Sequence, residues 1–396
     1  MSAAARGLEN VVVGSTRLSR VDGEAGSLVI GGFPVEELAP RARFEEVLFL
    51  LWRDRLPTGP ELADLRNGLA AARALPKATL AVLAHAAAAG LDAMDALRLG
   101  VASLPLADPD LARTELDGEP RAANERRGLA LVAATSAIVA SFHRLRGGEA
   151  PVAPDPALDH AANHLFMLRG ERPDPAAARA LETYLNTTID HGLNASTFTA
   201  RVIVSTRSDL VSAVAGAIGA LKGPLHGGAP GPALDLVLAL RDEARREERP
   251  LAEVAEREVR RIVREGGRIM GFGHRVYRVR DPRADVLGAA LDTFAPAAGG
   301  ELLADAQRVE AVILRVLAET KPGRRLDTNV EFYTALLLHG IGLPADLFTA
   351  TFAVARVGGW VAHAFEQIAE GRLIRPSVHY AGETSRRWQP LEARAA

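Results

Sequence analysis

Apolar residues repeat with the period of an α-helix along most of this chain, which limits the folds that it can adopt. From Val35 onward, apolar residues recur at i, i+3 and i+4 in nearly every segment, and the helix-favouring residues Ala, Leu, Arg and Glu are abundant. Examples of the predicted helices are residues 36–53, 59–74, 77–89, 157–169, 175–190, 209–221, 232–246, 251–265, 283–294, 301–318 and 344–369. Strand patterns do not alternate with these helices, which excludes a doubly wound nucleotide-binding fold. We therefore expect a mostly α protein, built as a large array of helices.

The first part of the chain has a different pattern. The stretch "NVVVGSTRLSRVDGEAGSLVIGGFPVEEL" has short β-branched runs separated by glycines, with a turn signal at Asp22-Gly23. One or two small strands are expected there. Two breaks rich in Gly and Pro, 146–156 and 222–232, interrupt the later helices. We interpret them as hinges within one architecture rather than as linkers between independent domains.

Composition and charge exclude several classes of function. The formal net charge of −2 lacks the basic excess that is usual in nucleic-acid-binding proteins. The absence of cysteine excludes disulfides, thiolate catalysis and Cys-ligated zinc. The first residues have no basic region followed by an apolar core, and the apolar run 129–142 is too short to span a bilayer. We interpret that run as a buried helix and expect a cytoplasmic protein without a membrane partner.

Three short segments place a titratable side chain beside residues that give the backbone freedom. His226 lies in "GPLHGGAPG", His274 in "GFGHRVYRVRDPR" and Glu331 in "TNVEFY". The arginines after His274, which can bind carboxylate or phosphate through paired hydrogen bonds, are Arg275, Arg278, Arg280 and Arg283. Two histidines, a carboxylate and several arginines suit enolisation or aldol-type chemistry on an anionic substrate, which needs a base, a carbonyl polariser and anion ligands.

Glu331 allows two interpretations. It follows Thr328 and Asn329, both good N-cap residues, so it can lie in the first turn of a helix, where the helix dipole favours an acid. It also lies between Val330 and Phe332, and an ionised carboxylate in apolar surroundings needs partners or an upward shift of its pKa. The residues alone leave open whether Glu331 is an ordinary first-turn acid or a base in a site that excludes water.

The other histidines have simpler interpretations. His160 and His164 in "DHAANH" are one helical turn apart, but no third ligand is evident, so we expect them on a helix surface rather than at a metal. His363 in "WVAHAFEQ" lies on an amphipathic helix and is expected in the core or an interface. A structural role in a turn or a helix cap also stays open for His226 and His274. Neither glycine-flanked segment has the spacing of a phosphate-binding loop.

Taken together and in this order, the motifs resemble those of the citrate synthase family. The segments that carry the resemblance, over nearly the whole chain, are "VDGEAGSLVIGGFPVEELA", "DHGLNASTFTARV", "LKGPLHGGA", "GFGHRVYRVRDPR", "NVEFYTA", "ARVGGWVAHAFEQ" and "RLIRPSVHYAG". The resemblance implies an all-α homodimer of two-domain subunits. A large helical domain, residues 1–222 plus 329–396, would carry the dimer contacts and the oxaloacetate site. A small mobile domain, residues 223–328, would close over oxaloacetate, complete the acyl-CoA site and exclude water.

The resemblance also implies an acyltransferase of the tricarboxylic acid cycle. Such an enzyme condenses acetyl-CoA with oxaloacetate and hydrolyses citryl-CoA to citrate and CoA. By position, Glu331 would remove a methyl proton from acetyl-CoA, His226 would hydrogen-bond the thioester oxygen, and His274 would donate to the oxaloacetate ketone. No metal or redox cofactor is implied, because the thioester supplies the driving force.

Further positions match the substrate ligands of the family. His191, Arg283 and Arg356 match ligands of oxaloacetate, and Arg375 matches a ligand that usually comes from the partner subunit. Arg278 and Arg324 match cations that bind the phosphates of CoA.

The chain departs from the usual family pattern at several positions. The usual acid at position 331 is aspartate, which is one methylene shorter than Glu331. Thr188 replaces a common histidine, Asp327-Thr328 an aromatic-proline pair and Ile30-Gly31 an aromatic-arginine pair. These departures leave open a dicarboxylate-binding paralogue with little or no activity. A 2-methylcitrate synthase that uses propionyl-CoA also stays open, because one methylene in an apolar pocket is worth only about 1–3 kcal/mol.

Overall fold

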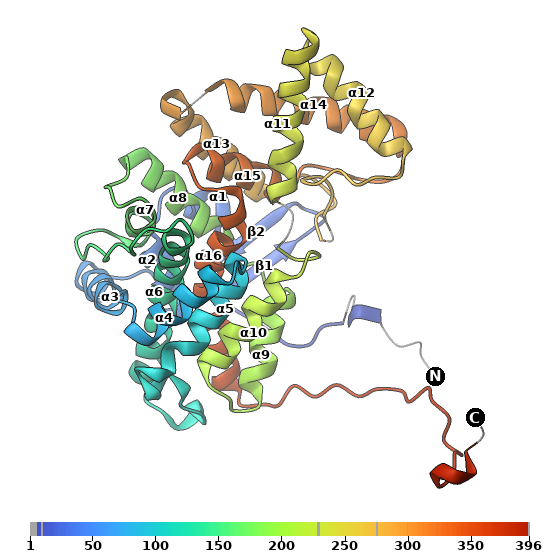
Figure 1. The fold of residues 1–396 in the computed structure, drawn as a ribbon. Helices are drawn as coiled ribbons and strands as arrows, with labels where there is room; N and C mark the ends of the chain where they lie inside the picture. Colours follow the sequence, from blue (N-terminus) through green and yellow to red (C-terminus); the bar gives the residue numbers. More distant parts are fainter. Residues whose placement is uncertain (1–5, 9–10, 228–229, 275, 299, 395–396) are drawn as a thin grey trace.

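The computed structural model describes residues 6–8, 11–227, 230–274, 276–298 and 300–394. Within them helices dominate, which confirms the mostly α prediction (Figure 1). The helices are α1 (Val35–Leu38), α2 (Phe44–Arg53), α3 (Gly59–Ala72), α4 (Lys77–Ala88), α5 (Ala93–Ser103), α6 (Arg121–Arg146), α7 (His160–Arg169), α8 (Pro175–Thr188), α9 (Ala195–Ser205), α10 (Leu210–Lys222), α11 (Pro230–Glu247), α12 (Leu251–Arg264), α13 (Pro282–Ala298), α14 (Gly300–Thr320), α15 (Val330–Gly340) and α16 (Phe348–Glu370). Arg275 lies outside the described residues.

One small antiparallel sheet forms near the N-terminus. Its strands are β1 (Ser19–Asp22), β2 (Ser27–Ile30) and β3 (Phe33–Pro34), in the order β1-β2-β3. Arg20 pairs with Val29, and the predicted turn at Asp22-Gly23 joins the first two strands. The very short third strand was not expected. Along β2 only alternate residues are fully buried, as the period of a strand requires.

Two helix predictions needed correction. The single helix expected over 36–53 is two helices, because Pro40 has no backbone N–H and interrupts the pattern between α1 and α2. Helix α9 was not predicted, since its β-branched residues have low helix propensity. Its start is fixed by Asn194, whose side chain accepts a hydrogen bond from the backbone N–H of Thr197 at 3.1 Å.

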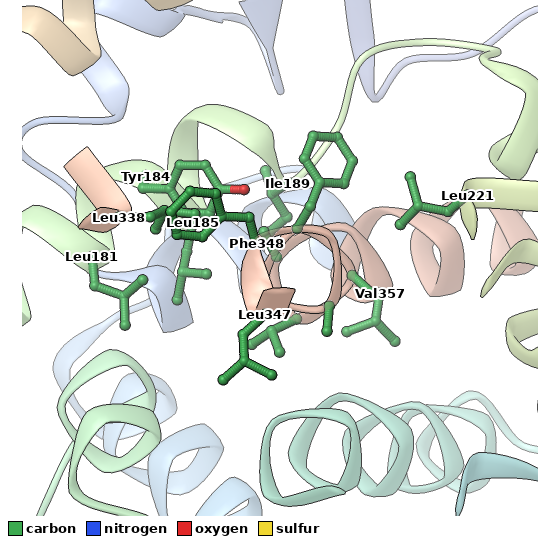
Figure 2. Packing of buried hydrophobic residues seen from close by; sticks show 14 of the residues in the cluster. Leu181, Tyr184, Leu185, Ile189, Leu221, Leu338, Leu347, Phe348 and Val357 are labelled. Atoms are coloured by element: carbon green, nitrogen blue, oxygen red, sulfur yellow. The ribbon is translucent and has the colours of Figure 1, made fainter. Parts of the chain in front are cut away.

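Helix α16 runs through the core of the protein. Figure 2 shows it end-on, among side chains from α8, α10 and α15. The labelled residues there are Leu181, Tyr184, Leu185, Ile189, Leu221, Leu338, Leu347, Phe348 and Val357. The segment after α8 lies directly on this helix: a Cβ added at Gly359 would lie 2.2 Å from the carbonyl oxygen of Ile189. Only glycine permits this approach, which places the following Asp190 and His191 beside α16.

Helix α6 is long and apolar enough to cross a membrane by length and composition alone. However, 72% of its most apolar window is buried inside the protein. Helices α3, α4, α5, α7 and α16 contact it. These contacts confirm that residues 129–142 belong to a buried helix of the core.

The surface location expected for His160 and His164 is wrong. Both side chains are fully buried, because α7 packs between α6 and α8 and neither of its faces is free. His160 stacks on Phe44, with ring centroids 4.6 Å apart. His164 Nδ1 lies 3.0 Å from the hydroxyl of Ser136. The core position expected for His363 is confirmed.

Helices α11, α12 and α14 gather at one end of the molecule (Figure 1). They pack on one another, and α11 also packs on α15. Helix α13 joins this group to the rest, since it contacts α14, α15 and α8. The loops that enter and leave these helices carry most of the residues singled out by the sequence.

Candidate active site

One cavity of about 780 Å³ brings together seven of the nine predicted site residues. Those that line it are His191, His226, His274, Arg283, Arg324, Glu331 and Arg356. They come from the loop after α8, the loop after α10, the segment before α13, the segment before α15, and helices α13, α15 and α16. The fold therefore collects side chains that are up to 165 positions apart (191 to 356) around a single space.

Glu331 is the second residue of α15 and faces this cavity. The Asn329 side chain caps the helix by accepting a hydrogen bond from the Glu331 backbone N–H at 2.9 Å, which confirms the predicted helix start. Burial raises the pKa of the Glu331 carboxyl to about 7. The Arg283 charge opposes this shift, Asp281 adds to it, and Arg356 opposes it more weakly. The carboxyl is thus poised between its neutral and charged forms near neutral pH.

The segment around His274 is held by the segment that precedes Glu331. Gly271 and Gly273 both have positive φ angles, of 88° and 81°, which favour glycine. The backbone N–H of Gly273 donates to Asp327 O at 2.7 Å, and Asn329 Nδ2 donates to Gly273 O at 2.8 Å. The same asparagine that caps α15 therefore also fixes the backbone beside His274.

The hydrogen bonds of His274 determine which ring nitrogen carries the proton. Its Nδ1 accepts from the backbone N–H groups of Val276 and Tyr277, at 3.0 and 3.1 Å. Burial and the nearby Arg283 charge lower the pKa of the ring to about 4. The ring is therefore neutral at pH 7 with its proton on Nε2, which makes Nε2 a hydrogen-bond donor.

The turn between β1 and β2 supports the other side of the same loop. A Cβ added at Gly23 would lie 2.1 Å from the carbonyl oxygen of Val276, so only glycine allows this approach. The backbone N–H of Arg278 donates to Gly23 O at 2.8 Å. The small N-terminal sheet thus braces the loop that carries His274.

His226 is anchored through Ser196 at the start of α9. Its Nε2 lies 2.8 Å from the Ser196 hydroxyl and 3.3 Å from the Ser196 backbone N–H, and Trp360 Nε1 donates to the same hydroxyl at 3.1 Å. The Thr349 hydroxyl of α16 donates to Gly227 O at 2.7 Å and holds the adjoining backbone. Burial lowers the pKa of His226 to about 4. With Nε2 occupied, Nδ1 of a neutral ring is the nitrogen available to a ligand.

Three cationic or polar side chains form one wall of the cavity. Arg283 makes a two-point ion pair with the buried Asp281, with Nε–Oδ1 and Nη2–Oδ2 distances of 3.0 and 2.7 Å. Arg356 Nε donates to the carbonyl oxygen of Thr188 at 2.6 Å. His191 Nε2 lies 3.2 Å from the Tyr277 hydroxyl, and burial holds the pKa of His191 well below its usual value. This wall offers fixed donors to a small dianion.

The remaining predicted residues lie elsewhere. Arg278 is exposed beside Glu24 and does not line the cavity. Arg375 is exposed on the C-terminal segment after α16, which extends away from the helices (Figure 1). Conversely, Arg268 and Lys321 line the cavity beside Arg324 although the sequence did not single them out. Arg268 follows Gly266-Gly267 and Lys321 precedes Pro322-Gly323, so the glycine-rich context that singled out the histidines could also have pointed to these two cations.

The family described as "Citrate synthase, C-terminal domain" matches residues 7–377 of the chain. A citrate synthase from Haloferax volcanii is 41% identical over 389 residues, which is 98% of this chain and 98% of that protein. The chain belongs to the citrate synthase family. A 2-methylcitrate synthase from Mycobacterium tuberculosis, another relative, is 38% identical over 96% of this chain and 91% of its own length.

Among solved structures, the fold matches the citrate synthase of Thermoplasma acidophilum in its ternary complex with carboxymethyl coenzyme A and oxaloacetate. The TM-score is 0.86 at 28% identity, with full coverage of both chains. In this citrate synthase family member, no three His, Asp or Glu side chains within the described ranges come together in a way that could hold a metal ion.

Proposed function

We propose that this enzyme condenses acetyl-CoA with oxaloacetate and hydrolyses the resulting citryl-CoA to citrate and CoA. One observation carries the proposal: a carboxyl with a pKa near 7, Glu331, shares a single cavity with the two neutral histidines His226 and His274. The relative crystallised with carboxymethyl coenzyme A and oxaloacetate supports these substrate classes.

The first step is an enolisation. Glu331 removes a proton from the methyl group of acetyl-CoA, and the electron pair of that C–H bond forms the carbon–carbon double bond of the enolate, which becomes the enol to the extent that His226 shares its proton with the thioester oxygen. A thioester α-proton is weakly acidic, so the developing negative charge on the thioester oxygen needs a donor at once. His226 supplies it, since its ring is neutral and its Nε2 is already anchored by Ser196.

The second step forms the new carbon–carbon bond. The enol carbon attacks the ketone carbon of oxaloacetate, and the ketone oxygen gains negative charge that a proton from His274 Nε2 neutralises. The two N–H groups at Nδ1 hold that proton on Nε2. Water then cleaves the thioester of citryl-CoA and releases CoA and citrate.

Arg283 and Arg356 bind the carboxylates of oxaloacetate together with His191. Arg324, with Lys321 and Arg268 near it, faces the CoA phosphates; the exposed Arg278 contributes less directly. Residues 223–328 form the mobile small domain that closes over the substrates.

The enzyme is a homodimer in which Arg375 reaches the oxaloacetate site of the partner subunit. The position of Arg375 on an exposed segment outside its own cavity supports this proposal. Arg375→Ala is expected to weaken oxaloacetate binding about tenfold, because a desolvated Arg–carboxylate contact is lost. Mixed dimers provide the measurement: Arg375→Ala in one subunit and Glu331→Gln in the other leave no complete site if the arginine acts within its own chain, and one complete site if it acts across. Pairing both changes in the same subunit gives the complementary result and serves as the control.

Activity should depend on pH through Glu331. The base must be ionised, and its pKa is raised to about 7, so kcat/KM is expected to fall as pH drops through about 7. The histidines do not contribute to this fall, because their pKa values of about 4 keep them neutral throughout that range. A pH–rate profile between pH 5 and pH 9, taken from initial rates of thiol release, measures the acid limb. A flat profile would contradict the assignment of Glu331 as base.

A steady-state comparison of acetyl-CoA and propionyl-CoA tests the proposed function. We expect saturable thiol release from acetyl-CoA that requires oxaloacetate, with a higher kcat/KM than for propionyl-CoA. A clear preference for propionyl-CoA would favour the 2-methylcitrate synthase alternative, which the relative from Mycobacterium tuberculosis supports. Oxaloacetate binding without turnover would favour the paralogue with little or no activity.

A further inference from the structure

A buried carboxylate that does not line the cavity links the segments on both sides of the base. Glu310, in α14, is only 7% exposed. Its Oε1 accepts hydrogen bonds from the Thr328 hydroxyl at 2.6 Å and from Arg280 Nη1 at 2.5 Å. Its Oε2 accepts from the Tyr333 hydroxyl at 2.6 Å. One side chain thus holds three donors from three different segments.

Two of these donors, Thr328 and Tyr333, lie on either side of Glu331 in the sequence. Thr328 precedes Glu331 by three residues, and its carbonyl oxygen accepts from the backbone N–H of Asp281 at 3.2 Å. Tyr333 follows Glu331 by two residues in the first turn of α15. Glu310 therefore holds one side chain before the base and one after it in the sequence.

The third donor extends the link to the loop that carries His274. Arg280 lies between His274 and Arg283, and its guanidinium is 5.5 Å from the centre of the Tyr333 ring. Arg280 Nε also donates to Asp285 at 2.6 Å, on the exposed side of the cluster. None of Glu310, Thr328, Tyr333 and Arg280 lines the cavity, so any effect on the reaction must act through other residues.

We infer that Glu310 is a positioning residue that fixes Glu331 and the His274 loop relative to one another. The inference rests on the proposed function, in which Glu331 is the base. Glu310 and Thr328 lie in the proposed small domain and Tyr333 in the large one, so the cluster spans the junction where closure bends the chain. A displacement of about 1 Å at a reacting group can lower a rate by about 10²-fold. A glutamate base has one more rotatable bond than an aspartate, so a fixed backbone at its helix start matters more here.

The test uses substitutions that remove a charge or a hydroxyl from the Glu310 cluster but nearly keep the size of the side chain. Glu310→Gln removes the charge that pairs with Arg280, and Thr328→Val removes one donor but keeps the shape. Each is expected to lower kcat about tenfold, and the double variant should be no worse than about tenfold, because both break the same link. Thr328→Ser, which keeps the hydroxyl, should retain kcat within about twofold. The oxaloacetate Kd, measured by calorimetry, should change less than kcat, because two of its three proposed ligands, His191 and Arg356, lie on other elements.

Asp285→Asn is the matched control. It removes the other carboxylate of Arg280 without touching Thr328 or Tyr333, so kcat should stay within about twofold of wild type. The inference is overturned if Thr328→Val and Thr328→Ser lose equal activity, or if Thr328→Val is as active as wild type. It is also overturned if Asp285→Asn lowers kcat as much as Glu310→Gln does.

Amide hydrogen exchange separates this inference from the proposed function. In Glu310→Gln and Thr328→Val, amides of residues 271–281 and 327–333 should exchange faster than in Asp285→Asn, whether or not the enzyme turns over. Faster exchange in these two variants, together with a wild-type protein that forms no citrate, would refute the proposed function and leave the positioning role standing. Unchanged exchange would overturn the positioning role.

Discussion

Replacing Glu331 with glutamine is expected to lower kcat by about 10²–10⁴-fold, the range typical for removal of a general base. Glutamine has nearly the same size and leaves the cap on α15 in place, because that cap uses the Glu331 backbone N–H. It cannot accept the methyl proton of acetyl-CoA. Oxaloacetate binding should be nearly unchanged, since its proposed ligands lie on other segments. Thiol release measures kcat, and calorimetry measures the oxaloacetate Kd.

Two companion variants sharpen this experiment. Glu319→Gln, an exposed glutamate at the end of α14 paired with Arg260, controls for the loss of a carboxylate and should keep wild-type activity. Glu331→Asp restores the acid usual in the family and shows whether the surrounding backbone has adapted to the longer side chain. A wild-type rate for Glu331→Gln would mean that Glu331 is not the base.

Asp281→Asn is expected to lower the free energy of unfolding by about 3–5 kcal/mol, because it leaves a buried cation without its counter-charge. The Asp281 carboxylate is fully buried, and the side chain of its partner Arg283 is 4% exposed. Both carboxylate oxygens are used by Arg283, and Oδ2 also accepts from the Val330 backbone N–H at 3.3 Å. Urea denaturation measures the change.

The exposed pair between Arg280 and Asp285 provides the comparison. Asp285 is 62% exposed, so Asp285→Asn should cost no more than about 1 kcal/mol. Equal losses of unfolding free energy for Asp281→Asn and Asp285→Asn would show that the buried ion pair contributes no more to stability than the exposed one. Asp281→Asn has a second readout: the Asp281 charge helps to raise the pKa of Glu331, so its removal should move the acid limb of the pH–rate profile to lower pH.

The helices and the chemical groups could be read from local sequence. Apolar spacing predicted most helices, and glycine-framed motifs singled out His226 and His274 before any contact was known. Glu331 was singled out as a carboxylate between two apolar residues at a helix start. Local patterns were wrong where the outcome depends on what packs against a segment. His160 and His164 have the spacing of a surface pair, yet α6 and α8 cover both sides of their helix.

Residues that act through distant partners gave no sequence signal. Ser196 anchors a histidine 30 positions away, and Glu310 binds donors 18 and 23 positions along the chain. An isolated serine or a glutamate in a charged helix resembles many others, so only the folded contacts distinguish them.

Glu331 shows which properties of a residue follow from the local sequence and which follow from the folded structure. Asn329, a good cap, and the helical pattern of the following residues were enough to predict that this carboxylate lies at a helix start. The choice between a first-turn acid and a base depends on folding, because the burial that raises the pKa of Glu331 to about 7 comes from segments far away in the sequence. Desolvation depends on the whole surroundings of a group, and no local pattern encodes it.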